Sequence, residues 1–319
     1  MSENAIKRDV LNERQKWSLD KKIEHAKERI IEWYEAFDGK VYVAFSGGKD
    51  STVLLHIVRS IYPKVPAVFF NTGLEFPEIL RFVRQTKNVS FQRPKMSFKE
   101  IIEKNGYPVI SRRISQYIRE VRALGGRETN LKRLRLTGIK PDGAISSIDK
   151  IPLKWQFLLD APFKISDKCC TKMKKETAKN YVKKTGRMPY IAIMADESVQ
   201  RTAGYLKLGC NAFDLKNPKS TPIAIWKEKD IWNYIKKYKV EYSPIYNMGY
   251  RRTGCVFCMF GIHLEGTPNR FQLMKKTHPR LWNYCMNELK MAEVLDYLKI
   301  PTYEVSEMFD IKTIDTHGI

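Results

Sequence analysis

The chain has 319 residues, of which 43% are hydrophobic and 29% charged, a composition typical of globular rather than disordered proteins. No stretch approaches the ~20 apolar residues of a membrane-spanning helix, and residues 1–5 lack the apolar core of a secretion signal, so we expect a cytoplasmic protein without a membrane partner. The net charge of +22 favours a polyanionic partner such as nucleic acid, although a solvated lysine-rich surface would give the same charge.

The first half of the chain alternates helices with short apolar strands. Apolar residues at three- and four-residue spacing predict a helix over 19–37, with Ser18 as its N-cap. The run 41–45 predicts a buried strand, 52–61 a helix and 66–70 a second strand. Further along, the same patterns predict a helix at 77–87, strands at 89–92 and 189–194, and helices at 227–239 and 268–299.

This alternation predicts an α/β fold, a parallel twisted sheet with flanking helices that binds ligands at the carboxyl ends of its strands. Residues 111–150 interrupt the rhythm with ten basic and four acidic side chains, and we interpret them as a basic insertion that is helical around 114–124. The expected organisation is an N-terminal helical arm at 1–37, one catalytic domain at 38–262 and a C-terminal helical extension at 263–319.

The segment Ser46–Ser51, Ser-Gly-Gly-Lys-Asp-Ser, lies between a predicted strand and a predicted helix. Glycines let the backbone approach an anion, and the amides at a helix N-terminus face it. Ser46 and Ser51 add hydroxyl donors, and Lys49 adds a positive charge. Because Asp50 follows Lys49, the segment is not a Walker A loop, which requires Ser or Thr at that point.

These residues resemble the pyrophosphate-binding loop of the PP-loop ATP pyrophosphatase superfamily and, within it, the phosphoadenosine phosphosulfate reductase family. Further stretches match in the same order over roughly residues 38–262: 70–78, Ala195–Ser198 with Arg201, 226–232 and 246–258.

The resemblance implies an adenine nucleotide α-hydrolase-like fold whose loop holds the β,γ-phosphates of ATP, or the sulfate-bearing end of a sulfonucleotide. It places 71–73 near the adenosine. The nucleotide-binding candidates are Ser46, Gly47, Gly48, Lys49, Asp50, Ser51, Asn71, Thr72 and Gly73. The catalytic candidates are Lys49, Asp50, Asp196, Glu197 and Arg201, with Asp50, Asp196 or Glu197 positioning Mg²⁺.

Four cysteines form two pairs, Cys169-Cys170 and Cys255-x-x-Cys258. Four thiolates from two loops can close a tetrahedral sulfur site, and flanking lysines and arginines are expected to lower the thiol pKa values. The arrangement resembles that of the family members that bind a [4Fe-4S] cluster. Zn²⁺ is the alternative, since thiolates suit both, and free buried thiols are the third possibility.

Two features depart from the reductases of this family. Their nucleophilic cysteine lies in a Glu-Cys-Gly tail, whereas residues 309–319 contain no cysteine. Cys285 lies on an apolar face of a predicted helix, so we interpret it as a core residue. We interpret Cys210 as structural, and a sulfur-carrying role for it is left open. Met194 stands where the reductases commonly place an arginine, which puts recognition of a sulfate group in doubt.

The leading hypothesis is therefore an ATP-dependent sulfur-transfer enzyme that acts on nucleic acid, either DNA or tRNA, with DNA phosphorothioation enzymes of the same family as the functional model. We expect a separate protein to donate the sulfur. Whether the chain forms a homodimer is left open. The predicted nucleic-acid contacts are Arg112, Arg113, Arg119, Arg122, Lys132, Arg133, Arg135, Lys172, Arg251 and Arg252. The alternatives are a sulfonucleotide reductase that releases sulfite and a non-catalytic nucleotide- or nucleic-acid-binding accessory protein.

Overall fold

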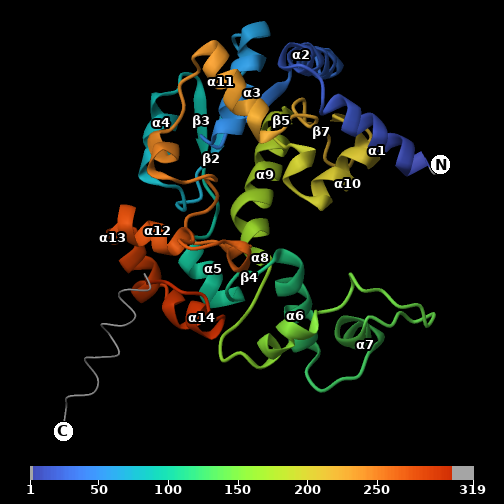
Figure 1. Cartoon of the computed structure of the whole chain (residues 1–319), viewed down its shortest axis with the longest axis vertical. Helices are drawn as coiled ribbons and strands as arrows, with labels where there is room; N and C mark the ends of the chain where they lie inside the picture. The colour runs from blue at the N-terminus through green and yellow to red at the C-terminus, as the bar shows by residue number, and fades with distance from the viewer. Residues whose placement is uncertain (1–2, 304–319) are drawn as a thin grey trace. The chain divides into compact units, whose positions relative to one another are not determined.

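The computed structural model describes residues 3–303, which fall into two compact units (Figure 1). Unit 1 consists of 3–94, 176–247 and 251–253, and unit 2 of 95–175, 248–250 and 254–303. None of the helices within 3–303 has the length and apolar character that a bilayer crossing requires.

Unit 1 is built on a six-stranded sheet with the order β3-β2-β1-β5-β7-β6. The strands pair in parallel except for β6, which runs antiparallel to β7. Their bounds are β1 Val41–Ala44, β2 Ala67–Phe70, β3 Val89–Gln92, β5 Met188–Ile191, β6 Asn211–Ala212 and β7 Lys219–Ser220.

The centre of this sheet is a topological switch point. β1 pairs with β2 on one side, with Val43 opposite Ala67, and with β5 on the other, with Ala44 opposite Ile191. The chain runs outward from β1 through β2 to β3 and returns on the other side at β5. Because these strands are parallel, the loops after β1, β2 and β5 emerge at one edge, where α/β sheets bind ligands.

The helices of unit 1 flank this sheet. Their bounds are α1 Glu3–Arg14, α2 Leu19–Ala36, α3 Lys49–Ile61, α4 Pro77–Gln85, α9 Glu176–Thr185, α10 Val199–Leu208 and α11 Glu228–Tyr238, with short turns η3 Ala195–Glu197 and η4 Pro244–Met248.

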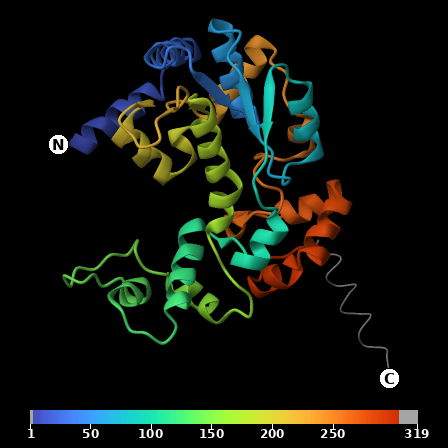
Figure 2. The same ribbon diagram turned by 180° about the vertical axis from the view of Figure 1, so that it is seen from behind.

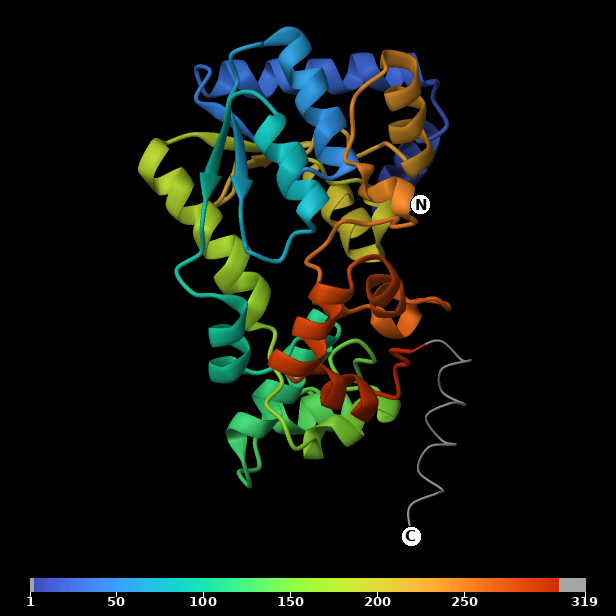
Figure 3. The same ribbon diagram turned by 90° about the vertical axis from the view of Figure 1, so that its left-hand side faces the viewer.

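Ring contacts fix several of these helices. Tyr181 of α9 meets Tyr42 of β1 edge-on at 4.9 Å, so α9 packs on the sheet face that carries this tyrosine (Figure 2). α2 and α3 lie side by side, and Tyr34 stacks on Tyr62 with ring centroids 3.6 Å apart (Figure 3). The hydroxyl of Tyr190 in β5 donates to the carbonyl of Ile30 in α2 at 2.7 Å, which joins the sheet to that helix.

Unit 2 is mainly helical around a two-stranded parallel ribbon, in which Val109 of β4 lies opposite Met259 of β8. The ribbon brings the chain after α5 next to the chain after Cys258. The bounds are α5 Phe98–Asn105, β4 Val109–Ile110, α6 Arg112–Leu124, α7 Asn130–Thr137, η1 Leu153–Asp160, α8 Lys168–Cys170, η2 Thr171–Lys175, β8 Met259–Phe260, η5 Ile262–Leu264, α12 Arg270–Thr277, α13 Pro279–Asn283, η6 Tyr284–Glu288 and α14 Met291–Tyr297.

The predicted α/β fold with a mainly parallel sheet is confirmed, and Ser18 caps α2 by accepting from the amide of Lys21 at 3.3 Å. The helix expected around 114–124 is α6, and a second helix, α7, follows it in the basic segment. The compact units follow other boundaries than the expected single domain at 38–262, because 95–175 leaves the sheet and joins the C-terminal helices. The tail at 309–319 lies outside the described residues.

Candidate active site

The loop between β1 and α3 adopts a conformation that requires glycine. Gly47 has φ +72°, and a Cβ there would lie 2.7 Å from Cγ2 of Val83 and 2.9 Å from Cγ2 of Ile79. At Gly48, the N-cap of α3, a Cβ would lie 2.6 Å from Oγ1 of Thr253. Glycine is therefore required at both positions because neighbouring side chains pack closely against the loop at the N-terminus of α3.

The two serines of the loop have different roles. Ser51 is buried, and its hydroxyl donates to the carbonyl of Gly48 at 2.9 Å and accepts from the amide of Ser46 at 3.1 Å. Ser51 thus holds the loop together. The Ser46 side chain is exposed, with its oxygen 3.0 Å from that of Ser51, and it is the hydroxyl that a bound anion meets first.

A tyrosine covers the start of α3. The backbone amide of Lys49 donates to Oη of Tyr246 at 2.8 Å, and that oxygen lies 3.2 Å from Oγ1 of Thr253. Neither residue was predicted to belong to the site. The sequence signal that could have indicated them is the resemblance of the stretch 246–258 to the family.

The Lys49 ammonium is buried and lies between two carboxylates, 3.4 Å from Oδ1 of Asp50 and 3.2 Å from Oε1 of Glu228. Burial lowers the pKa of Lys49, but the charges of Asp50, Tyr246 and Glu228 outweigh it and raise the pKa above its usual value. Lys49 is therefore positively charged and can form an ion pair with a polyphosphate. Glu228 was not predicted.

Asp50 carries a buried oxygen with unused bonding capacity. Oδ1 accepts no hydrogen bond within the described residues, and burial raises the pKa of Asp50 despite the nearby Lys49 ammonium. The contact of Oδ1 with the Lys49 ammonium, at 3.4 Å, is an ion pair, and a carboxylate held in this way can also bind a hard cation such as Mg²⁺.

The loop after β5 brings Arg201 to the same site. Arg201 forms an ion pair with Glu197, and its pKa is lowered by burial and by the charge of Arg252, while Asp50 raises it. Glu197 also accepts from the amide of Met194 at 2.9 Å, so its carboxylate fixes the loop, whereas Asp196 is exposed. Of the three predicted Mg²⁺ candidates, Asp50 has a buried oxygen that accepts no hydrogen bond within the described residues, although it pairs with Lys49.

The turn after β2 is fixed by its own side chains. The Thr72 hydroxyl donates to Oε1 of Glu75 at 2.6 Å, and Oδ1 of Asn71 accepts from the amide of Gly73 at 3.1 Å. The turn leaves the same sheet edge as the phosphate loop, since β1 and β2 are parallel neighbours. Its predicted place beside the adenosine stays a prediction.

All four paired cysteines lie in unit 2. Cys169 is buried in α8, and the amide of Cys258 donates to the carbonyl of Cys255 at 3.0 Å, which forms a tight turn. Burial raises the pKa of Cys169, and the charges of Cys255, Cys170 and Cys258 raise it further, so the four thiols lie within electrostatic range of one another. Within 3–303, however, no three His, Cys, Asp or Glu side chains are arranged to hold a metal ion.

The expected lowering of the thiol pKa values by basic neighbours is wrong for the free thiols. Lys174 lowers the pKa of Cys169 and Cys170, but burial outweighs it in both cases. Burial also raises the pKa of Cys258 to about 11, against the opposing charge of Arg270. Arg270, which was not predicted, donates to the carbonyl of Cys258 at 2.9 Å and pairs with Glu265.

Several predicted nucleic-acid contacts hold the protein together instead. Arg122 donates four hydrogen bonds, to the carbonyls of Leu158, Leu159, Ala161 and Phe163, at 2.7 to 2.9 Å. These bonds occupy most of its guanidinium, so a phosphate contact is the wrong role for Arg122.

Other basic side chains of the segment are partly engaged. Arg135 pairs with Glu120 at 2.8 Å and lies 3.7 Å from the ring centre of Tyr117, and Arg119 pairs with Asp167 at 2.9 Å. Arg112 donates to Thr171 at 3.3 Å, Lys132 pairs with Glu128 at 2.5 Å, and Lys172 is half-buried. The exposed members of the predicted set are Arg113, Arg133, Arg251 and Arg252.

The two remaining cysteines are not exposed nucleophiles. Cys285 is 0% exposed, and its thiol lies 3.4 Å from the sulfur of Met291, while burial raises its pKa. Burial likewise raises the pKa of Cys210 to about 12. A reactive cysteine needs access and a lowered pKa, and neither residue has both.

Comparison with known proteins gives modest sequence identities. An uncharacterised protein of Methanocaldococcus jannaschii is 24% identical over 277 residues, which cover 82% of this chain and 51% of that protein. The chain thus spans about half the length of that curated relative. An adenosine 5'-phosphosulfate reductase of Bacillus cereus is 19% identical over 248 residues, covering 76% of this chain and 82% of that enzyme.

Two solved structures are similar at low TM-scores. The phosphoadenylyl-sulfate reductase of Candida auris in a phosphate complex has a TM-score of 0.42 and 17% identity, and covers 72% of this chain and 87% of its own. The U34-tRNA thiolase of Methanococcus maripaludis with its [4Fe-4S] cluster has a TM-score of 0.36 and 15% identity, and covers 85% of this chain and 79% of its own.

The model of the phosphoadenosine phosphosulfate reductase domain matches residues 40–137 and 153–260. The match includes the phosphate loop, the motif around Arg201 and all four paired cysteines. It also includes α6 and α7, so only 138–150 of the basic segment 111–150 lies outside the match. The chain therefore belongs to the phosphoadenosine phosphosulfate reductase domain family.

Proposed function

We propose that this chain is an ATP-dependent sulfur-transfer enzyme that carries an iron–sulfur cluster and acts on nucleic acid. ATP would activate an oxygen of the substrate: the oxygen bonds to the α-phosphorus, the α–β phosphoanhydride breaks and pyrophosphate leaves. A sulfide-level sulfur from a separate donor protein would then displace AMP from the activated position, so that sulfur takes the place of the oxygen.

The phosphate loop supports the first step. The loop lies at the N-terminus of α3, the exposed Ser46 adds a hydroxyl, and the buried Lys49 adds a positive charge. Asp50, whose carboxylate pairs with Lys49 at 3.4 Å, would bind the Mg²⁺ that accompanies ATP. Such prearranged charges stabilise the charge that builds up on a leaving pyrophosphate.

The four-cysteine group, Cys169, Cys170, Cys255 and Cys258, would hold the cluster. Its donors are all sulfur, the set that [4Fe-4S] clusters use, and the electrostatic coupling of Cys169 with the other three supports their grouping. Bound there, a cluster would keep the chain around it folded or carry sulfur. Zn²⁺ is the alternative occupant, because four thiolates suit it equally.

The observation that carries the choice of sulfur transfer over reduction is the state of the other two cysteines. A reductase of this family takes the sulfite group on a free thiol. Cys285 is completely buried, and burial raises the pKa of Cys210 to about 12, so neither favours that role.

A nucleic-acid substrate is supported by charge. The chain carries 57 basic and 35 acidic residues, and Arg113 and Arg133 are exposed on the helical segment of unit 2. Lysines and arginines that neutralise phosphates supply most of the non-specific affinity for nucleic acids.

Sulfonucleotide reduction is the second candidate, and the Bacillus cereus adenosine 5'-phosphosulfate reductase favours it by its similarity over 76% of this chain. One anaerobic preparation separates the two. Sulfur transfer predicts pyrophosphate from ATP and no sulfite from adenylyl sulfate, whereas reduction predicts sulfite from adenylyl sulfate with a thiol reductant. Cys285→Ser should leave the first activity intact, and loss of sulfite release in this variant would support the reductase.

A further inference from the structure

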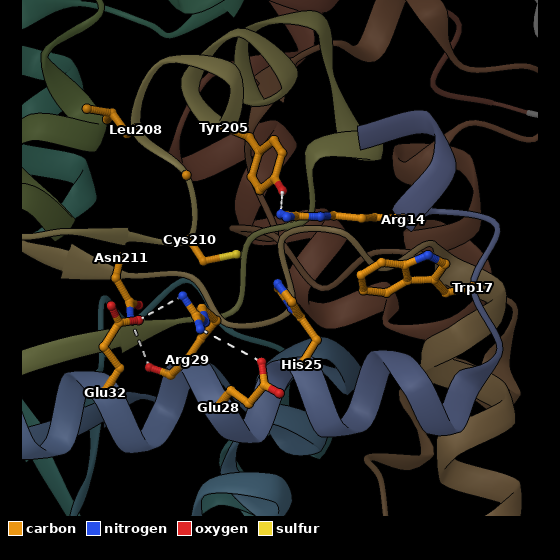
Figure 4. A pocket seen from close by; sticks show the side chains of 11 residues that line it. Arg14, Trp17, His25, Glu28, Arg29, Glu32, Tyr205, Leu208, Cys210 and Asn211 are labelled. Atoms are coloured by element: carbon orange, nitrogen blue, oxygen red, sulfur yellow. Dashed lines mark hydrogen bonds and ion pairs between the residues drawn. The ribbon is translucent and has the colours of Figure 1, made fainter. Parts of the chain in front are cut away.

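Unit 1 contains a cavity of about 420 Å³ that the proposed reaction does not use (Figure 4). It lies between the α1–α2 corner and the C-terminal end of α10. Its lining residues are Arg14, Trp17, His25, Glu28, Arg29, Glu32, Tyr205, Leu208, Gly209, Cys210 and Asn211. The volume is in the range of small-molecule sites.

One helix face supplies four of the polar groups. His25, Glu28, Arg29 and Glu32 repeat at three- and four-residue spacing along α2, so they line one side of the cavity. Figure 4 shows the imidazole of His25 between Arg14 and Cys210, with the thiol directed into the same space.

Arg14 is a cation without a carboxylate partner within the described residues. It donates to Oη of Tyr205 at 3.1 Å, and its other guanidinium N–H groups have no further hydrogen bond in this part of the chain. Arg29, by contrast, pairs with Glu32 at 3.0 Å and with Glu28 at 3.8 Å.

Two further nitrogens at the cavity lack partners. Nε of Arg29 and Nδ1 of His25 are both buried without a hydrogen bond within residues 3–303. Buried polar atoms are nearly always satisfied in native proteins, by protein, water or ligand. The cavity therefore offers a surplus of donors, which an occupant with acceptor oxygens would use.

The interior is electropositive. Burial, together with the charges of Arg14 and Arg29, lowers the pKa of His25 to about 4, so the imidazole is neutral near pH 7. The same two guanidinium groups also act to lower the pKa of Tyr205 and Cys210, although burial dominates and raises both. Side chains from three parts of the chain thus experience the same positive field.

We propose that this cavity binds a small organic monocarboxylate. Its carboxylate would pair with Arg14, whose planar fork suits two carboxylate oxygens, and Arg29 and His25 would supply further donors. Trp17 would contact the apolar body of the ligand.

The carboxylates of the lining limit the charge of the occupant. The side chains of Glu28 and Glu32 are 65% and 43% exposed, so they lie toward solvent and repel a second negative charge. A phosphate dianion is therefore disfavoured.

The site is distinct from the phosphate loop. Both involve α10, but Arg201 lies in its first turn, whereas Tyr205 and Leu208 lie in its later turns. No residue of the cavity belongs to the proposed active site, so the inference does not depend on the proposed reaction.

The test is a ¹⁹F NMR titration of the full chain with 4-fluorobenzoate, with the uncharged 4-fluorobenzamide as a probe of equal shape. We expect saturable binding of the acid and at least about tenfold weaker binding of the amide, because the charge-assisted bonds to Arg14 are lost. Equal binding of the two probes, or no binding of the acid up to about 10 mM, would overturn the proposal.

Variants locate the site. Arg14→Gln should weaken 4-fluorobenzoate binding by about tenfold or more, while Arg8→Gln, an exposed arginine of the same helix outside the cavity, should not change it. Cys210→Met should abolish binding by filling the cavity while Arg14 remains, because the Cys210 side chain points into this space (Figure 4). Thermal unfolding confirms that each variant is folded. Binding that survives both cavity variants would contradict the site, and equally effective competition by inorganic phosphate would contradict a carboxylate site.

Discussion

The backbone amide of Lys49 donates a hydrogen bond of 2.8 Å to the phenol oxygen of Tyr246, 197 residues further along the chain. The phenol thereby occupies the N-terminus of α3, where a phosphate oxygen would accept the same bond. Thr253 holds the phenol from the other side at 3.2 Å. A nucleotide bound at this loop as proposed would therefore have to displace Tyr246 from this amide.

Tyr246→Phe should tighten binding of ATP by about three- to tenfold. In this variant no phenol oxygen accepts the hydrogen bond of the Lys49 amide, so a phosphate oxygen can accept it without displacing a side chain. Calorimetric titration measures this change. Tyr242→Phe is the matched control, since the Tyr242 hydroxyl bonds to Asn247 rather than to the loop. Unchanged or weaker ATP binding by Tyr246→Phe would show that the phenol assists the nucleotide instead.

Gly47→Ala should destabilise the protein by about 2–4 kcal/mol, from the positive φ and from overlap with Val83 and Ile79. Nucleotide binding should be lost as well, because the loop must shift. Chemical denaturation and ATP titration check the two effects. Gly126→Ala is the control, since nothing lies within 4 Å of its added Cβ, and it should change stability by no more than about 0.5 kcal/mol.

Cys169→Ser should remove most of the iron from anaerobically purified protein, since one of four ligands is lost. Cys285→Ser should keep the iron and instead lower stability by about 1–2 kcal/mol, because a hydroxyl replaces a thiol in an apolar core. Iron and sulfide analysis measures the loss of iron in Cys169→Ser, and chemical denaturation measures the loss of stability in Cys285→Ser. Full iron content in Cys169→Ser would remove this cysteine from the ligand set.

Arg122 and Arg133 should respond differently to substitution by glutamine. Arg122→Gln removes a guanidinium that donates to four carbonyls and should cost about 2–3 kcal/mol of stability. Arg133→Gln should leave stability unchanged, weaken nucleic-acid binding and reduce the salt slope by about one. Fluorescence anisotropy at several salt concentrations measures the slope, and an unchanged slope would exclude Arg133 from the interface.

His25 makes stability depend on pH. Its pKa is about 4 in the folded protein, against an ordinary 6.5, because burial and the two arginines disfavour the imidazolium. Between these values the unfolded chain binds the proton and the folded chain does not, so stability falls as the pH drops from 6.5 toward 4.

Given the partial exposure of this side chain, the loss is about 1–2 kcal/mol. His25→Gln should flatten this part of the profile in urea unfolding experiments. A profile with the same slope in the variant would assign the effect to other groups.

The elements around the phosphate loop could be predicted from sequence because their signals are local. The strand at 41–44, the glycines at 47 and 48 and the helix that follows them all agree with one another, and the structure has them in that order. Ser18 capped the predicted helix for the same reason, since an N-cap bond spans only three residues.

The contacts that complete the site could not be predicted because they join distant parts of the chain. Tyr246 and Glu228 reach Lys49 from segments that carry no local sign of this contact. Arg122 looked like a phosphate contact because a count of charges does not reveal which guanidinium groups bind carbonyls. The thiol pKa values were predicted in the wrong direction, because burial in the fold outweighs nearby lysines.

In the proposed reaction, ATP is cleaved at the phosphate loop to activate a nucleic-acid substrate. The most direct measurement is pyrophosphate release from ATP and Mg²⁺ by the anaerobically purified full chain, with and without DNA or tRNA, beside a Lys49→Met variant as the loop control. We expect pyrophosphate release to increase when DNA or tRNA is added and to disappear in the Lys49→Met variant. No pyrophosphate under any condition, with sulfite formed from adenylyl sulfate instead, would contradict it.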